Sequence, residues 1–186
     1  MNIIENYLTI NPFSRPAIKI PKITGIVVHY VNSVKQTGNE VRNYFEKRKN
    51  GFLDYGSAHE IIDFNGDVIL MIPKNEIAYH VGATKYKEDA LTKLNTKNPN
   101  FYTYSIELCH TTIDGKPNNL QFISLEKRLI DLCLEFNLNN ENIFRHWDIT
   151  GPKKDGTLCP KYFVENPDEW FLLLDRVQNE IDKNIN

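Results

Sequence analysis

The chain has 186 residues, of which 41% are hydrophobic and 25% are charged, so it is long enough to bury one large core in a single domain. Its formal net charge of −2 provides no basic surface for nucleic acid, and no apolar run reaches the roughly 18 residues that a membrane-spanning helix needs. We therefore expect a globular protein that neither binds nucleic acid nor inserts into a membrane, with a monomer as the default.

The cysteines and the first residues bear on the cellular compartment. Cys109, Cys133 and Cys159 are an odd number at irregular spacings, which argues against a disulfide framework and indicates a reducing cytoplasm. The opening stretch, MNIIENYLTINPFSRP, lacks the basic, apolar and small-residue regions of a secretory signal. We therefore expect synthesis in the cytoplasm without a signal peptide.

The first elements expected along the chain are a buried strand and a helix. Residues 23–30, ITGIVVHY, form a continuous β-branched apolar run that is typical of a buried strand, and His29 lies near its end. Residues 37–49 begin with Thr37, followed three positions later by the Glu of a capping box, and Gly51 follows as a stop signal. This pattern predicts a helix that packs beside the strand.

The middle of the chain predicts three further strands. Residues 57–64 and 67–73 are two strand-like runs separated by Asn65-Gly66, the strongest hairpin signal in the chain. Residues 102–109, YTYSIELC, indicate another strand.

The last third of the chain predicts two helices around a short strand. Residues 123–136 place their apolar side chains on one helical face, which we expect to cover the sheet. A short strand at 142–146 leads into the Gly- and Pro-containing segment 150–160, and residues 167–182 indicate a helix with Pro167 in its first turn. The order of elements is that of an α/β fold.

Three side chains have the chemistry of a catalytic zinc site, which takes three protein ligands and leaves a position open for water. His29 ends the first buried strand, while His146 and Cys159 lie 13 residues apart, a spacing that suits a loop folding back onto a strand. Taken singly, each is explained more simply as a hydrogen-bonded histidine or a small buried thiol. The case for a metal site therefore depends on finding them in a larger pattern.

Such a pattern exists, because five motifs follow one another in a set order: VVHY at 27–30, SAHEIID at 57–63, AYHVG at 78–82, SIEL at 105–108 and RHWDITG…CP at 145–160. This series resembles the type 2 N-acetylmuramoyl-L-alanine amidases, which include phage lysozymes of the amidase kind, bacterial muropeptide amidases and animal peptidoglycan recognition proteins. The resemblance covers about residues 20–165. It implies a single domain over 1–186 with a central mixed β-sheet flanked by helices, and with the helix at 167–182 at the C-terminus.

The resemblance also implies roles for individual residues. One zinc ion per chain would be held by His29, His146 and Cys159, and would polarise the scissile carbonyl and lower the pKa of its water. Glu107, in SIEL, matches the acidic residue that takes the proton of this water and passes it to the leaving nitrogen. Alternation along the strand turns Glu107 to the face opposite its two apolar neighbours, which is consistent with a polar cleft.

Thr157 is the residue expected to stabilise the oxyanion, and a nearby Lys is the alternative that the sequence leaves open. Several family members carry Lys two positions before the Cys, but this chain has Thr157 there, and a hydroxyl donor stabilises an oxyanion less strongly than a cation. Lys153 or Lys154 could supply the charge if their loop folds inward. Two adjacent lysines in a Gly-flanked loop are more simply explained as solvated, which is the interpretation that the sequence favours.

Three further residues are expected around this centre. His80, in AYHVG, resembles a family element that lines the substrate groove, so we expect it to contact substrate. His59, in SAHE, would be structural or lie behind the ligands. Asp148, in HWD, would orient His146 or cap the following turn, since a ligating imidazole usually donates its second N–H to an acceptor. His110, next to SIEL, is expected to be a polar loop residue and not a ligand.

The function implied is hydrolysis of the amide bond between N-acetylmuramic acid and L-alanine in bacterial peptidoglycan. The absence of a signal sequence favours a phage or prophage endolysin that a holin releases to reach the cell wall. The alternative is a non-catalytic peptidoglycan-binding module of the same fold. In such modules the cysteine is typically replaced, so its retention as Cys159 favours the enzyme.

Other classes of hydrolase fit the sequence less well. A metallopeptidase of the H-E-x-x-H type is not indicated, because His59-Glu60 is followed by Ile61-Ile62-Asp63. A serine hydrolase would need a G-x-S-x-G motif, which the chain lacks. A cysteine nucleophile at Cys159 would leave His29 without a role.

Overall fold

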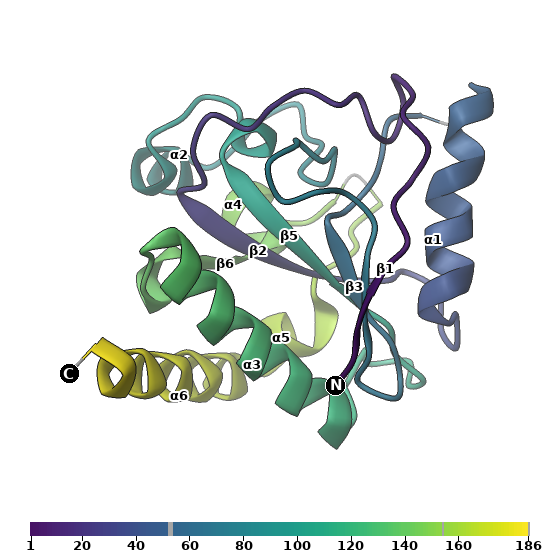
Figure 1. Cartoon of the computed structure of the whole chain (residues 1–186). Helices are drawn as coiled ribbons and strands as arrows, with labels where there is room; N and C mark the ends of the chain where they lie inside the picture. Colours follow the sequence, from purple (N-terminus) through teal and green to yellow (C-terminus); the bar gives the residue numbers. More distant parts are fainter. Residues whose placement is uncertain (52–53, 154, 186) are drawn as a thin grey trace.

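A mixed β-sheet forms the centre of the structure, a computed structural model that describes residues 1–51, 54–153 and 155–185 (Figure 1). The strands follow the order β1-β4-β3-β5-β2-β6 across the sheet, and β3 and β4 pair antiparallel while the other neighbours pair in parallel. The predicted mixed sheet is therefore confirmed. In the described part of the chain, the strands are β1 (Ile3–Glu5), β2 (Gly25–Tyr30), β3 (Glu60–Ile62), β4 (Val68–Leu70), β5 (Thr103–Leu108) and β6 (Ile143–Arg145).

Helices pack on both faces of this sheet, as predicted (Figure 1). One face is covered by α3 and α6 with α5 beside them, and α1, α2 and α4 lie around the other face. The α-helices are α1 (Gly38–Lys47), α2 (Glu88–Leu94), α3 (Asn119–Phe136), α4 (His146–Thr150), α5 (Lys161–Glu165) and α6 (Pro167–Ile185). Short 3-10 helices are η1 (Arg48–Asn50), η2 (Pro99–Phe101) and η3 (Asn140–Asn142).

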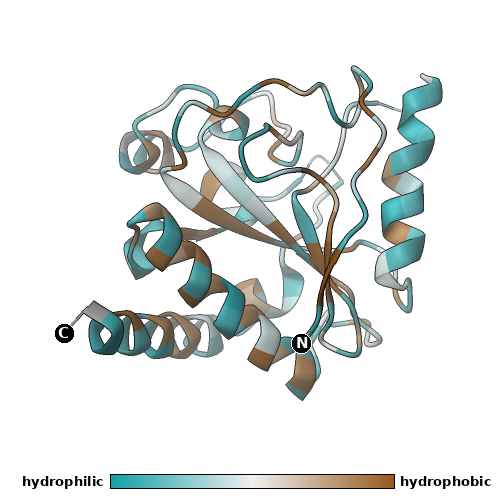
Figure 2. Ribbon diagram, viewed as in Figure 1, coloured by the Kyte–Doolittle hydropathy of each residue, from teal (hydrophilic) through white to brown (hydrophobic). Residues whose placement is uncertain are grey.

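The alternation of side chains along β2 divides the core into two layers. Ile26 and Val28 join the core against α3 and α6, whereas Val27 joins a cluster with residues of α2 and α4. His29 follows the direction of Val27, because side chains two positions apart share a face. In the parallel register of β2 and β5, His29 lies opposite Glu107, so both project from the face that α3 and α6 do not cover. Figure 2 shows much of β2 in brown, which is consistent with burial on both sides.

Local signals placed the first helix and the hairpin correctly. Thr37 accepts a hydrogen bond from the backbone of Glu40 and the Glu40 side chain accepts one from the backbone of Thr37, which completes the predicted capping box of α1. Gly51 follows η1 with φ +74°, and Gly66 occupies the hairpin turn with φ +80°, conformations that glycine adopts at low cost. The strands of the hairpin are shorter than the runs that predicted them.

Other boundaries differ from the predictions for local reasons. Helix α3 begins four residues earlier than the apolar pattern indicated, because Asn118 and Gln121 form a capping box that the sequence analysis did not use. His146, expected at the end of a strand, is the first residue of α4. The elements β1, α2, α4 and α5 were not predicted, because each is too short to show a clear periodicity.

The helices of the described residues bear on the expectation that no segment spans a membrane. None of the helices found there combines the length and the apolar character needed to cross a bilayer.

Candidate metal centre and active site

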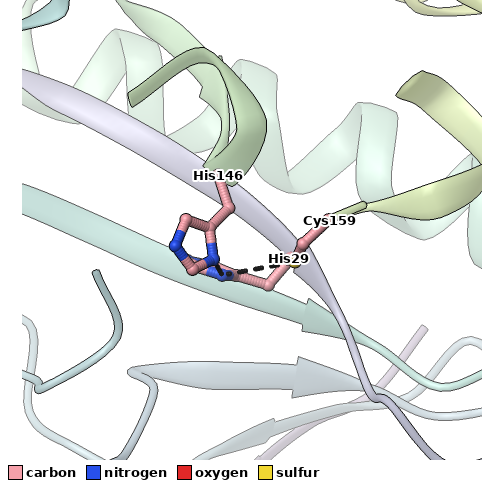
Figure 3. Close-up of side chains that lie close together, drawn as sticks. All are labelled: His29, His146 and Cys159. Carbon is pink, nitrogen blue, oxygen red and sulfur yellow. Dashed lines mark hydrogen bonds between the residues drawn. The ribbon is translucent and has the colours of Figure 1, made fainter. Parts of the chain in front are cut away.

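Three buried side chains from distant parts of the chain meet at one end of the sheet (Figure 3). His29 comes from the end of β2, His146 from the start of α4, and Cys159 from the segment just before α5. The Nδ1 atoms of His29 and His146 are 3.1 Å apart, and Sγ of Cys159 is 3.8 Å from Nδ1 of His29. The ligand atoms of the three residues all lie within 4.8 Å of one another, so this group could hold a metal ion.

The local structure around α4 presents two of these side chains. Arg145 is the N-cap of α4, and its guanidinium donates to the Asp148 carboxylate at 2.7 Å, while Asp148 also accepts from the Arg145 backbone N–H at 2.8 Å. The Trp147 N–H donates to the Cys159 carbonyl at 2.8 Å, which holds the following segment against α4. Asp148 therefore caps the helix, and its carboxylate bonds to Arg145 instead of orienting His146. Of the two roles foreseen for Asp148, the geometry supports capping.

Burial keeps both histidines neutral, which is the state in which an imidazole can bind a cation. Burial, together with the neighbouring charges of His146, His80 and Lys153, holds the pKa of His29 well below its usual range. Burial and the charge of Lys153 lower the pKa of His146 to about 3. Both imidazoles are therefore neutral across the neutral pH range, and each has one unprotonated ring nitrogen.

The Cys159 thiol is the third donor, and in the protein alone it is protonated. Burial raises its pKa to about 12, although the positive charge of Lys153 opposes the shift. A thiol with such a pKa is a poor nucleophile at neutral pH, because the thiolate is the reactive form. A coordinated cation would instead remove the proton outright. The electrostatics favour Cys159 as a metal ligand over Cys159 as a nucleophile. All three cysteines are free and buried.

A groove of about 600 Å³ opens beside the metal group, and His146 is the candidate ligand that lines it. Its wall includes the side chains of Tyr55, Tyr79, His80, Glu107, His146 and Lys153. Burial raises the pKa of Glu107 to about 7, with the Lys153 charge opposing the shift. In the described part of the chain, Oε2 of Glu107 and Nε2 of His146 are buried without a hydrogen-bond partner. Unpaired buried polar atoms are costly, which points to a site built to engage polar groups of a ligand.

The structure also bears on the group that was left open as an oxyanion stabiliser. Lys153 lines the groove, and its charge reaches Glu107, His29, His146 and Cys159, lowering the pKa of each. Thr157 does not line the groove, and its backbone N–H donates to the Asp155 carboxylate at 2.9 Å. The sequence favoured a solvated Lys153. The side chain's position on the groove depends on how its loop folds, which the sequence does not show. Lys154 lies outside the described residues.

The two other histidines near the site have different surroundings. His80 lines the groove but is only 8% exposed, and its Nδ1 lies 2.9 Å from Nε2 of His29. His59 is fully buried, with one ring nitrogen 2.9 Å from Oγ of Ser105 and the other 2.9 Å from the Glu76 carbonyl oxygen. The contacts of His59 are those of a structural residue, which was one of its two expected roles. Contact of His80 with substrate stays a prediction.

Two residues that the sequence analysis set apart from the metal site, Glu60 and His110, have partners elsewhere in the structure. Glu60 is fully buried on the α3 side, where Arg128 donates to it at 2.7 Å and Tyr104 donates to it at 2.7 Å. It is therefore committed to the core and cannot pair with His59 as in a metallopeptidase. His110 is a buried loop residue whose ring nitrogens lie 2.6 Å and 2.7 Å from the carbonyl oxygens of Val31 and Thr112, and it is not in the metal group.

Two residues that the sequence analysis did not single out also shape the site. Thr103 Oγ1 lies 3.0 Å from Nε2 of His80, and the side-chain oxygen of Asn100 accepts from the backbone N–H groups of His80 and Val81 at 3.1 and 2.8 Å. The strand pattern contained a signal for Thr103, because it lies two positions from Ser105 and four from Glu107 and so shares their face. Asn100 offered no comparable signal.

Comparison with known proteins agrees with this geometry. Residues 20–162 match the family model Amidase_2, described as N-acetylmuramoyl-L-alanine amidase. The chain is 27% identical over 172 residues to N-acetylmuramoyl-L-alanine amidase CwlL of Bacillus licheniformis, covering 89% of this chain and 44% of that protein. It is 28% identical over 185 residues to N-acetylmuramoyl-L-alanine amidase BlyA of Bacillus subtilis (strain 168), covering 96% of this chain and 47% of that protein. The chain thus spans less than half the length of these curated relatives.

Solved structures share the fold at low sequence identity. The structure of PlyL superposes with a TM-score of 0.71 at 19% identity, covering 96% of this chain and 98% of that chain. The catalytic domain of XlyA superposes with a TM-score of 0.69 at 20% identity, covering 95% of this chain and 99% of that chain. The family model covers most of the chain, including all three candidate metal ligands and Glu107. This chain therefore belongs to the Amidase_2 family of N-acetylmuramoyl-L-alanine amidases.

Proposed function

We propose that the protein is a zinc-dependent N-acetylmuramoyl-L-alanine amidase, which hydrolyses the amide bond between the lactyl group of N-acetylmuramic acid and L-alanine in bacterial peptidoglycan. The observation that carries this proposal is the buried group of His29, His146 and Cys159 at the edge of a groove that also contains Glu107. A pure recognition module would have little use for such a donor set beside an unpaired carboxylate.

The donor set suits zinc in both chemistry and spacing. Two nitrogens and one thiolate are typical zinc ligands, and three protein ligands leave a fourth position open, as catalytic sites require. In a tetrahedral zinc site, two nitrogen ligands lie about 3.3 Å apart and a nitrogen and a sulfur lie about 3.6 Å apart. The observed 3.1 Å and 3.8 Å are close to these values. These two spacings are compatible with an ion held by the three residues, whose ligand atoms all lie within 4.8 Å of one another.

The remaining chemistry belongs to side chains of this protein. Zinc held at the three ligands would supply Lewis acidity for the scissile carbonyl and an acidified water. Glu107 accepts the proton of the attacking water and returns it to the nitrogen of the departing alanine, because a carboxylate with a pKa of about 7 can both accept and donate near neutral pH. Lys153, on the groove wall, stabilises the negative charge that develops on the carbonyl oxygen.

We further propose that the protein acts in cell lysis as a phage or prophage endolysin. One protein of similar fold is described as a mutant endolysin from Bacillus subtilis, and the curated relatives are amidases of Bacillus. The expected partner is the peptidoglycan of a bacterial wall, reached after release from the cytoplasm in which the protein is made.

The proposal is tested on purified bacterial cell walls. Newly freed N-terminal alanine and newly freed reducing sugar are followed together, first with the protein as purified, then with a chelator, and then after zinc is restored. We expect release of alanine alone, lost with chelator and recovered with zinc. Reducing ends, or cutting that resists chelation, would contradict the proposal, and wall binding without cleavage would support the non-catalytic module instead.

A further inference from the structure

A series of hydrogen bonds connects the candidate metal ligand His29, on β2, to the backbone carbonyl of Pro99 in η2. His29 Nε2 lies 2.9 Å from Nδ1 of His80, and the other nitrogen of His80, Nε2, lies 3.0 Å from Oγ1 of Thr103. The Thr103 hydroxyl donates to the Pro99 carbonyl oxygen at 2.8 Å. The side chains are shielded from solvent, with 2%, 8% and 0% of His29, His80 and Thr103 exposed.

The donor and the acceptor of each hydrogen bond in this series follow from its last group, the Pro99 carbonyl. A carbonyl oxygen can only accept, so the single hydroxyl proton of Thr103 is used on Pro99 and the Thr103 oxygen must accept from His80. His80 therefore carries its proton on Nε2, which leaves Nδ1 as an acceptor. His29 must then carry its proton on Nε2 and donate it to His80. What remains on His29 is an unprotonated Nδ1, the atom that faces His146 and Cys159.

We propose that His80 and Thr103 are positioning residues for the metal ligand His29, and that they hold it in the tautomer and orientation in which Nδ1 can bind the ion. The proposal rests on the metal centre of the proposed function and assigns to His80 a role other than contact with substrate. Both ring nitrogens of His80 already form hydrogen bonds within the protein, so substrate could bond to either nitrogen only by replacing one of these bonds.

The protein also fixes the position of the His80 ring. Asn100 accepts from the backbone N–H groups of His80 and Val81, and Tyr79 and Ser57 exchange backbone and side-chain hydrogen bonds at 2.9 and 3.0 Å. The rings of His80 and His29 meet nearly at right angles, with centroids 5.1 Å apart. This arrangement is what a positioning group requires, because an imidazole that is held on its second nitrogen loses less freedom when it binds a metal.

The test compares the zinc affinity of variants in the absence of substrate, by competition with a chromophoric chelator. His80→Leu removes both bonds, and we expect the zinc dissociation constant to rise by about 10–100-fold. Thr103→Val keeps the shape of the side chain but frees the tautomer of His80, and we expect a rise of about tenfold. His80→Asn should restore most of the affinity, because its amide oxygen can accept from His29 as Nδ1 of His80 does.

Ser105→Ala is the matched control, because Ser105 lies on the same strand and face as Thr103 and also has a buried hydroxyl. That hydroxyl bonds to His59, which is not in the metal group. We expect its zinc affinity to equal that of the wild type. Thermal unfolding of each metal-free variant checks that it is folded. If His80→Leu fails to fold, His80→Asn and Thr103→Val still decide the question, since they retain the polar or steric character of the site.

A second measurement needs no metal. Two-bond ¹H–¹⁵N correlation spectra of the histidine rings should show the Nε2–H tautomer for both His29 and His80 in the wild type, and Thr103→Val should mix the tautomers of His80. An Nδ1–H tautomer of His29 in the metal-free wild type would overturn the proposal.

The outcomes separate this inference from the proposed function. A wild-type protein that does not bind zinc would overturn the metal centre itself. Wild-type binding with unchanged affinity in His80→Leu and Thr103→Val would overturn only the positioning role. If instead His80→Leu raised KM for wall fragments at saturating zinc while its zinc affinity stayed at the wild-type value, His80 would be a substrate contact.

Discussion

Glu107 is a residue of this site whose carboxylate is buried, although a charged carboxylate is more stable in water. Burial raises its pKa from 4.5 to about 7, and its Oε2 atom has no partner in the described part of the chain. The folded state therefore binds the proton of Glu107 more tightly than the unfolded chain does. Between pH 4.5 and pH 7 the unfolded state loses this proton first, so stability decreases as the pH rises through that window. Such strain is typical of groups that are poised for proton transfer.

Glu107→Gln should therefore separate activity from stability. Because the amide cannot accept the proton of water, we expect amidase activity to fall by at least about 100-fold. Because the amide carries no charge to bury, we expect the metal-free variant to be more stable than the metal-free wild type by about 1–3 kcal/mol at pH 8, with little difference at pH 4. Urea unfolding at the two pH values measures this. If the variant and the wild type were equally stable at both pH 4 and pH 8, Glu107 would be well solvated in the folded protein.

At the scale of elements, a carboxylate of α1 binds both the N-terminal segment and two basic side chains. Glu46 on α1 accepts from the backbone N–H and the hydroxyl of Thr9 at 3.0 and 2.6 Å, and it pairs with Lys49 at 2.8 Å and with Arg42 at 3.3 Å. Burial by itself raises the pKa of Glu46, but the hydrogen bonds from Lys49 and Thr9 and the charge of Arg42 outweigh it and lower the pKa to about 2. The charged form thus stabilises the packing of α1 beside the groove.

This shift predicts a loss of stability in acid. The folded-state pKa is below the unfolded value, so the stabilisation is complete above about pH 4.5 and disappears as the pH falls towards 2. We expect Glu46→Gln to lower the free energy of unfolding by about 1–2 kcal/mol at pH 7 and to have no effect near pH 2. Glu135→Gln is the control, because its ion pair with Lys74 is exposed and should contribute less than about 1 kcal/mol. An equal loss in both variants at pH 7 would contradict this account.

At the scale of the whole molecule, the metal centre joins parts of the chain that are far apart in sequence. Its three donors come from β2, from α4 and from the segment before α5, so a bound ion would link the central strand to two later elements. An ion that binds the folded state and not the unfolded chain stabilises the fold by mass action.

Zinc should therefore raise the unfolding temperature. At a free concentration 100 times the dissociation constant, we expect about 2.7 kcal/mol of added stability, which corresponds to about 5–10 °C for a chain of this size. Scanning calorimetry with zinc and with chelator measures the shift. Cys159→Ala should abolish it, since two histidines alone bind zinc weakly, whereas Cys133→Ala, which removes a buried thiol outside the metal group, should keep it. A shift that persists in Cys159→Ala would place the ion elsewhere.

The sequence determined the features that depend on near neighbours and on residue chemistry. The apolar run ending at His29, the capping box at Thr37 and the Asn65-Gly66 turn predicted β2, α1 and the hairpin, because each depends on a few consecutive residues. The family resemblance identified three donor residues, and the mixed sheet flanked by helices followed the expected order.

Only the tertiary structure decided what depends on partners distant in the chain. It directs Asp148 to Arg145 instead of His146, places Lys153 on the groove, and sets His80 and Thr103 behind His29. The sequence could not show these relations, because a side chain's partner depends on which segments the sheet brings together. Local pattern thus specified the elements and the chemical type of the donors, while the register of β2 with β5 and the packing of α4 specified the site.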